Sequence, residues 1–133
     1  MPAHALNTLF QHLDNAARQA GRPSPRLLAV SKHHPADAVA ALATALGSLA
    51  GDRARQTQAF GENYVQEARR KRDELADIDD IEWHLIGPLQ SNKARLAAQR
   101  FAWIETIDRL PVAVEALHPG PLRPLERELA TWE

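Results

Sequence analysis

The sequence has no cysteine, no long apolar run and no strong excess of either charge, and each absence removes a class of function. Without cysteine, the chain can form no disulfide, no thiolate metal site and no cysteine nucleophile. No segment approaches the roughly 20 apolar residues that span a bilayer, and the first residues lack the pattern of a signal peptide. A formal net charge of -1 gives no electrostatic reason to bind nucleic acid or an anionic membrane. We therefore expect a soluble cytoplasmic protein without nucleic-acid or membrane partners.

Lysine is also scarce in this sequence. Only three of the 16 basic residues are lysines, namely Lys32, Lys71 and Lys93. Lysine can lose its proton and act as a nucleophile, whereas arginine stays charged. Each lysine therefore either has a specific chemical use or is one of the few surface lysines of an arginine-biased protein. Composition leaves both interpretations open.

Hydrophobic periodicity predicts one helix followed by four pairs of a strand and a helix. The first helix, over residues 6–20, ends at Gly21 and Pro23. Strands that alternate with helices indicate a parallel sheet, so the predicted fold class is α/β. Residues 1–117 form one domain in this prediction, and the proline-rich residues 118–133 form a tail. The expected strands are 26–31, 59–61, 81–86 and 101–107, and the expected helices begin at or beside Pro35, Tyr64, Ser91 and Asp108.

The helix expected over residues 64–75 carries two further signals. Asn63 and Gln66 have the spacing of a capping box, in which side chains bond the free backbone N–H groups of the first turn. Residues 69–72 read Arg-Arg-Lys-Arg, which favours a solvated charged face. The polar stretch before this unit, residues 47–58, predicts a long connection.

Polar residues follow the predicted strands, at the edge where parallel α/β proteins bind ligands. Lys32 follows the first strand, Asn63 the second and Asn92 the third. A lysine directly after an apolar strand can be partly desolvated, which lowers its pKa and frees the amine to form an imine with an aldehyde. The alternative is a lysine that simply reaches solvent. Residues 87–93 lead into a helix N-terminus, which suits either a bound phosphate or an ordinary capped turn.

The histidines raise a metal hypothesis that their spacing does not favour. His33, His34, His84 and Glu62 could supply nitrogen and oxygen ligands. Neighbouring histidines usually point in different directions, however, and the sequence has no His-x-x-x-His pair. A histidine within a strand, such as His84, is more often a hydrogen-bonded core residue than a ligand. We therefore expect no metal site.

Four segments resemble the signature blocks of a known family, the pyridoxal phosphate (PLP) homeostasis proteins. The blocks are LAVSK at residues 28–32, FGENYVQE at 60–67, WHLIGPLQSNK at 83–93 and IDRL at 107–110. They occur in the family's order and match its N-terminal half. The second and third blocks are long, which makes a chance match implausible.

This resemblance implies a fold, a cofactor and a set of binding residues. The family fold is a TIM-type barrel like the N-terminal domain of alanine racemase, of which this chain would hold about four of the eight strand-and-helix units. PLP would be bound through a Schiff base to Lys32, with Asn63, His84 and Asn92 as further cofactor-binding residues. The implied role is non-catalytic: the protein would buffer PLP, or deliver it to PLP-dependent enzymes, in vitamin B6 homeostasis.

The chain departs from the family pattern in three respects. His34 stands where the family usually has a second lysine, residues 47–58 form a longer connection, and the C-terminal half with its phosphate grip is missing. Half a barrel also leaves two open sheet edges. We therefore expect a truncated or frameshifted product, or a fragment whose partner half is encoded separately. Two alternative functions stay open: a half-barrel that binds nothing by itself, and a racemase-type PLP enzyme with His34 or His84 as its base.

Overall fold

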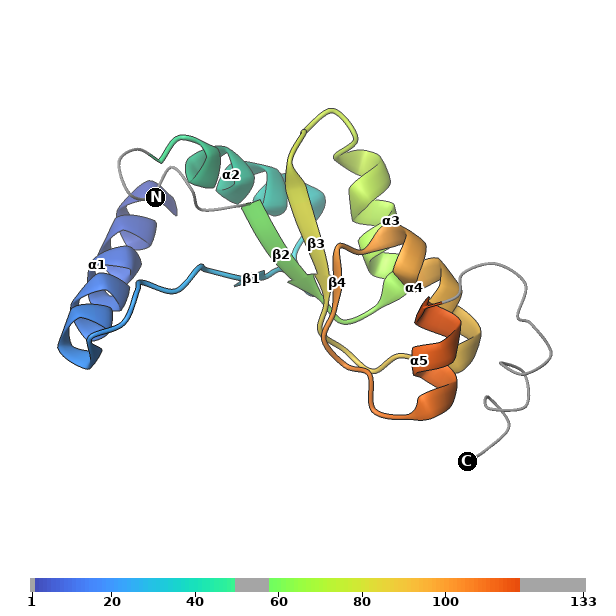
Figure 1. Cartoon of the computed structure of the whole chain (residues 1–133). Helices are drawn as coiled ribbons and strands as arrows, with labels where there is room; N and C mark the ends of the chain where they lie inside the picture. Colours follow the sequence, from blue (N-terminus) through green and yellow to red (C-terminus); the bar gives the residue numbers. More distant parts are fainter. Residues whose placement is uncertain (1, 50–57, 118–133) are drawn as a thin grey trace.

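The computed structural model describes residues 2–49 and 58–117, which form a four-stranded parallel sheet and its helices (Figure 1). This confirms the predicted α/β class. The strands lie in the order in which they occur in the sequence, β1-β2-β3-β4. The elements are α1 (Pro2–Ala20), β1 (Ala29–Val30), α2 (Ala36–Gly47), β2 (Gln58–Glu62), α3 (Val65–Glu74), β3 (Ile81–Leu85), the 3₁₀ helix η2 (Ser91–Lys93), α4 (Ala94–Arg100), β4 (Trp103–Ile104) and α5 (Leu110–Leu117).

One face of the sheet is covered by helices. From β1 to β4, each strand lies next to the one before it, always in the same direction across the sheet. Right-handed crossovers therefore place the connecting helices on the same face. Figure 1 shows α3, α4 and α5 grouped beside the strands. Phe60 of β2 lies opposite Trp83 of β3, and both belong to the hydrophobic core together with Val39 of α2 and Ala68 of α3. The core therefore lies between the sheet and its helices.

The other face of the sheet carries a different row of residues. Val30, Gly61, His84 and Trp103 lie opposite one another on successive strands, one position out of phase with the core residues. Because side chains alternate along a strand, this row points away from the helices. Val30 is 51% exposed and Trp103 is 55% exposed, so this face is open in the part of the chain that the structure describes. We call it the open face.

The first helix packs into the same core as the sheet. Leu6 and Phe10 of α1 are buried and belong to the cluster that holds Val39 and Leu46 of α2. Their spacing of four residues is the apolar stripe that the sequence predicts, and the helix ends before Gly21, which has a φ of 64°. A left-handed φ of this kind ends a helix readily at glycine. The N-terminal helix is therefore confirmed.

The edge strands are shorter than the sequence predicts. Residues 26–31 and 101–107 were expected to be strands, but β1 and β4 contain two residues each. Both lie at the edges of the described sheet, where a strand pairs on one side only. Single bonds continue beyond each, such as Ser31 N–H to the Gly61 carbonyl at 2.9 Å and Glu105 N–H to the Leu85 carbonyl at 3.0 Å. The backbone therefore runs alongside its neighbour without a full ladder.

The predicted helix caps are wrong. The N-cap of α3 is Tyr64, and no side chain makes a capping hydrogen bond there, so Asn63 and Gln66 form no capping box. Ser91 is the first residue of η2 instead of the cap of a longer helix. Most of the predicted connection over 47–58, and the tail over 118–133, lie outside the described residues.

A close backbone approach explains why Asn63 does not cap α3. A Cβ atom placed on Gly87 would lie 2.3 Å from the Asn63 carbonyl oxygen and 2.6 Å from its Cα. The chain leaving β3 thus packs directly against the chain leaving β2, at a distance that only glycine allows. Thr106 donates a hydrogen bond from Oγ1 to the Gly87 carbonyl at 2.5 Å, which adds the chain leaving β4 to the same contact. The ends of β2, β3 and β4 are therefore held together through Gly87.

We predict that Gly87→Ala lowers the free energy of unfolding by about 2 kcal/mol or more, because the methyl group must displace backbone atoms. Urea unfolding followed by circular dichroism would measure the loss. Gly47→Ala is the matched control, since its Cβ would meet only the end of the Gln58 side chain at 3.0 Å and alanine favours the helix. Equal stability of the two variants would contradict the close approach at Gly87.

Candidate functional site at the carboxyl ends of the strands

Three of the four predicted site residues lie at the carboxyl edge of the sheet. Lys32 follows β1, Asn63 follows β2 and Asn92 lies in η2, after β3. His84 is placed differently, within β3 and on the open face. The topology therefore brings the first three to one edge, although no hydrogen bond or ion pair within residues 2–49 and 58–117 joins Asn92 to Lys32 or Asn63.

Lys32 sits in a tight turn over residues 31–34. The His34 N–H donates a hydrogen bond to the Ser31 carbonyl at 3.0 Å, and His33 has a left-handed φ of 65°. Lys32 is exposed and makes no hydrogen bond or ion pair within residues 2–49 and 58–117. Of the two interpretations of Lys32, the described structure matches the lysine that reaches solvent, because no described side chain covers the turn.

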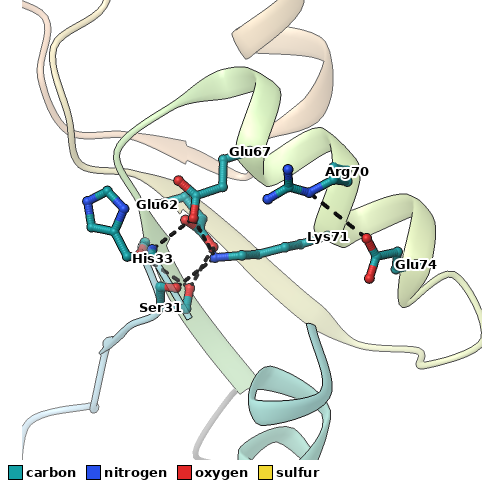
Figure 2. A network of polar contacts seen from close by, with 8 residues as sticks. Ser31, His33, Glu62, Glu67, Arg70, Lys71 and Glu74 are labelled. Carbon is teal, nitrogen blue, oxygen red and sulfur yellow. Dashed lines mark hydrogen bonds and ion pairs between the residues drawn. The ribbon is translucent and has the colours of Figure 1, made fainter. Parts of the chain in front are cut away.

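A buried ammonium group lies directly beside this turn (Figure 2). Lys71 is 2% exposed, and its Nζ lies 2.5 Å from Glu62 Oε1, 2.7 Å from the Ser31 carbonyl and 3.0 Å from Glu67 Oε1. Ser31 also donates its hydroxyl to Glu62 Oε1 at 3.0 Å. The His33 N–H donates to Glu67 Oε1 at 2.8 Å. We call Ser31, Glu62, Glu67 and Lys71 the Lys71 network.

The Lys71 network satisfies every donor of the ammonium group. Lysine has three N–H donors, and the three oxygen atoms around Nζ match them in number. Glu62 is fully buried, and its second oxygen, Oε2, has no partner among the described residues. Glu62 and Lys71 are removed from water and Glu67 is partly buried, so loss of the ammonium would leave two carboxylates facing each other.

The predicted solvated face of α3 is therefore wrong at one position. Arg69, Arg70 and Arg72 are exposed, but Lys71 is buried. A signal for this was present in the sequence, since Lys71 lies three residues after the buried Ala68, on the stripe that faces the sheet. Glu67, four residues before it, is at ion-pair spacing on the helix.

The pKa of Glu67 lies below its ordinary value of 4.5. Burial by itself raises this pKa, but the hydrogen bonds from Lys71 and from the His33 N–H, with the positive charges nearby, outweigh it. Folding therefore favours the ionised carboxylate, which is the form that the Lys71 network requires.

His84 forms a second polar cluster on the open face. Its Nε2 lies 2.7 Å from Glu82 Oε1 and its Nδ1 lies 2.5 Å from Glu105 Oε1. The Trp103 ring stacks against the imidazole, with 6.0 Å between ring centroids and 13° between ring planes. A neutral imidazole has one N–H, so two carboxylate partners require one further proton on the ring or on a carboxyl group. The predicted hydrogen-bonded histidine is confirmed.

Glu82 is held by partners on two sides. Burial by itself raises its pKa, but hydrogen bonds from His84 and Arg26, together with their charges, bring the pKa below 4.5. The Arg26 guanidinium lies 3.1 Å from Glu82 Oε1. His84 is thus fixed in orientation by a carboxylate that is itself paired.

A cavity of about 300 Å³ opens between the ends of β2 and β3. This volume lies at the lower limit of small-molecule sites. The cavity is at the edge where parallel sheets bind ligands, and Asn63 is one of its walls. Its lining residues are Asn63, Tyr64, Val65, Gln66, Pro88, Leu89, Gln90 and Lys93.

A larger hollow of about 530 Å³ lies at the opposite edge, near the start of β3 and of β4. Ile81 and Ala102 are among its walls, and Asp79, Asp80 and Arg100 give it mixed charge. Parallel sheets bind ligands at the carboxyl ends, so the smaller cavity is the better candidate despite its size.

The described residues also bear on metal and membrane binding. Within residues 2–49 and 58–117, no group of three or more histidine or acidic side chains could hold a metal ion. Glu62, proposed from the sequence as a ligand, is engaged by Lys71 on the helix-covered side of the sheet. No helix in the same part of the chain is long and apolar enough to cross a membrane.

Comparison with known proteins shows what this chain is similar to. No family model matches the chain. The pyridoxal phosphate homeostasis protein of Escherichia coli K12 is 44% identical over 130 residues, which cover 92% of this chain and 51% of that protein. The protein of the same name from Pseudomonas aeruginosa is 46% identical over 127 residues, covering 92% and 50%. The chain therefore spans about half the length of the curated relatives it matches.

Solved structures give the same result for the fold. PipY of Synechococcus elongatus PCC7942, solved without PLP, is 40% identical and covers 87% of this chain and 46% of PipY, with a TM-score of 0.69. The structure of PipY with PLP bound gives a TM-score of 0.65 at 38% identity. The parallel α/β fold of the described residues is thus similar to that of PipY. The predicted resemblance is confirmed: the chain is a relative of the pyridoxal phosphate homeostasis proteins, and the partial coverage fits their N-terminal half.

We predict that Lys71→Met lowers the free energy of unfolding by about 3–5 kcal/mol, because it leaves the buried Glu62 and the partly buried Glu67 without their cation. Chemical denaturation would measure the loss. Arg70→Met, on the same helix, removes an exposed ion pair with Glu74 of 4.0 Å and should change stability by less than about 1 kcal/mol. Similar losses in both variants would show that burial of Lys71 contributes nothing special.

The lowered pKa of Glu67 predicts a specific acid dependence of stability. Unfolded Glu67 binds its proton more readily than folded Glu67, so the stabilisation is fully present above pH 4.5 and is lost as pH falls below it. The stability difference between the wild type and Glu67→Gln should therefore shrink from pH 5 towards about pH 3. Urea midpoints measured across this range would test it, and a constant difference would contradict the assigned role of Glu67.

Proposed function

We propose that this chain binds PLP through a Schiff base between the cofactor aldehyde and the Lys32 amine, in cytoplasmic PLP homeostasis. The main support for this proposal is the position of Lys32. It is exposed in a turn at the carboxyl edge of the sheet, where parallel sheets bind ligands, and the fold is similar to that of PipY with PLP bound. The names of the curated relatives support the same role. PLP supplies a reactive aldehyde and, when bound, a protonated ring that withdraws electrons; the protein supplies position and charge.

The three lysines differ in their fitness for this role. The ammonium of Lys71 is buried and uses all three donors on oxygen atoms of the Lys71 network. Lys93 is partly exposed at the start of α4 and lines the 300 Å³ cavity. Lys32 is exposed at the end of β1 and lies within the first segment that resembles the family. Lys32 is therefore the anchor we propose.

Further cofactor contacts are proposed for Asn63, His84 and Asn92. Asn63 lines the cavity beside the chain that follows β3, and Gly87 holds its backbone in place. His84 presents a ring on the open face, stacked on Trp103 and held by two carboxylates. Asn92 is exposed in η2 at the same edge as Asn63.

We also propose that the four strand-and-helix units correspond to four of the eight units of a TIM-type barrel, within a domain over residues 1–117. The open face and the two edge strands support this, because a barrel closes both edges and fills its interior with side chains of the second half. The proposed separate tail, 118–133, lies outside the described residues.

The proposed role is that of a carrier or buffer, with PLP-dependent enzymes as recipients, and not that of a racemase. A racemase-type reaction needs a base on each side of the substrate carbon. His84, one of two candidates, has both ring nitrogen atoms engaged by Glu82 and Glu105. His34 is exposed and close to Lys32 in sequence, but it offers only one such base.

We predict that PLP added to the purified chain forms an adduct confined to Lys32. Borohydride reduction followed by mass spectrometry would locate it, and the visible absorbance of the Schiff base should disappear in Lys32→Ala. Lys93→Ala is the matched control and should keep both signals, while Lys71 should stay unmodified because it is buried. Adducts shared between Lys32 and Lys93, or none, would instead favour the half-barrel that binds nothing by itself.

A further inference from the structure

We propose that Glu67 and Lys71 are positioning residues for Lys32: from α3 they hold the backbone on both sides of it. The inference rests on the proposed function, since it assigns these residues a purpose in presenting the Lys32 amine. Neither residue touches that amine in the described structure. Their effect would pass through the turn over residues 31–34.

The geometry on both sides of Lys32 carries the inference. The Ser31 carbonyl, directly before Lys32, accepts a hydrogen bond from Lys71 Nζ at 2.7 Å. The His33 N–H, directly after Lys32, donates to Glu67 Oε1 at 2.8 Å. Figure 2 shows these bonds converging on the turn from one helix face. Of the polar backbone groups that flank Lys32, one on each side is thus fixed by a side chain of α3.

The turn has a conformation that needs such external support. His33 adopts a left-handed φ of 65°, which is unfavourable for a non-glycine residue unless its surroundings compensate. The bond from its N–H to Glu67 stabilises that conformation. The ring of His33 also lies 6.3 Å from that of Tyr64, at the N-cap of α3. The start of α3 therefore determines the path of the chain through Lys32.

Burial makes the support rigid. Lys71 is joined to Glu62 of β2 and to Glu67 of its own helix, so the turn is connected to two elements at once. The bonds from Lys71 to the Ser31 carbonyl and to Glu62 are buried and therefore stronger than at the surface, whereas the bond from the His33 N–H to Glu67 is exposed. The ammonium has no spare donor to exchange with solvent. An amine on a fixed backbone reaches a bound aldehyde more often in the reactive geometry. The condensation forms one C=N bond and releases one water molecule.

A purely structural role would look different in one measurable respect. If the Lys71 network only attached α3 to the sheet, loss of Glu67 would lower stability without changing which lysine reacts. A positioning role predicts a selective loss at Lys32, with Lys93 unchanged. Lys93 is an internal reference because it lies at the start of α4 and makes no hydrogen bond or ion pair with the Lys71 network among the described residues.

The test compares Glu67→Ala, Glu67→Gln and Glu74→Ala in the full chain. First, amide hydrogen exchange at His33 is measured by NMR without PLP, at a pH where each variant is folded. Second, the rate of PLP adduct formation at Lys32 and at Lys93 is measured by borohydride quenching and mass spectrometry. Gln keeps an oxygen acceptor for the His33 N–H, whereas Ala removes it. Glu74 lies on the same helix and pairs only at the surface with Arg70.

We expect Glu67→Ala to accelerate His33 exchange about tenfold or more and to slow adduct formation at Lys32 by a similar factor, since a lost hydrogen bond of about 1.4 kcal/mol corresponds to tenfold. The rate at Lys93 should not change. Glu67→Gln should recover most of both losses, and Glu74→Ala should match the wild type.

Two results would overturn the inference, and they are distinguishable from failure of the proposed function. Unchanged His33 exchange in Glu67→Ala would show that Glu67 does not hold the turn, whatever PLP does. Faster exchange with unchanged selectivity between Lys32 and Lys93 would make the Lys71 network purely structural. If the wild type itself forms no adduct at Lys32, the proposed function fails, and the positioning role fails with it, although the exchange data still report on the turn.

Discussion

Burial of the Lys71 ammonium is the constraint on which the arrangement at the carboxyl edge of the sheet depends. A charged group 2% exposed must find all its partners inside the protein, and it finds them on three separate elements: the end of β1, the end of β2 and its own helix. These elements cannot shift independently without leaving a charge unpaired. The Lys71 side chain, 39 residues away in the sequence, therefore holds the turn that carries Lys32 in position. Lys32 itself makes no hydrogen bond or ion pair with Lys71. Through the Lys71 network, the packing of α3 against the sheet thus sets the position of the turn that carries the exposed Lys32.

Two other interactions organise the rest of that edge. Gly87 allows the chain after β3 to contact the backbone of Asn63, and the Thr106 hydroxyl adds the chain after β4. On the open face, His84 lies between Glu82 and Glu105. The polar groups are thereby divided by the sheet: the Lys71 network lies on the helix-covered face, where it supports structure, and the His84 cluster lies on the face without helices. Such a division suits the proposed function, in which the carboxyl edge of the sheet presents the Lys32 amine and a few polar side chains to PLP.

The sequence predicted the architecture better than the local details. Alternation of apolar strands and amphipathic helices correctly indicated the parallel sheet, because that pattern reports which faces are buried. The capping box at Asn63 and Gln66 was wrong, because a contact with Gly87, distant in sequence, outweighs a local capping preference. Lys71 was wrongly grouped with three arginines on a solvated face, although its place on the stripe of Ala68 was a usable signal. The charge of Lys71 indicates a solvated position, whereas its place on the helix indicates a buried one. Burial of a lysine depends on acceptors that only the folded structure brings together.

The sequence by itself determined the fold class, the order of the elements, the scarcity of lysine and the placement of Lys32, Asn63 and Asn92 after successive strands. These properties follow from periodicity and from chain order, which are local. Only the tertiary structure decided which lysine is buried and which is exposed, and that His84 is bonded to two carboxylates. It also decided that the backbone around Lys32 is held from α3. Each of these depends on the distance between groups far apart in the sequence, and a hydrogen bond or a buried ion pair exists only when folding brings both partners within about 3 Å.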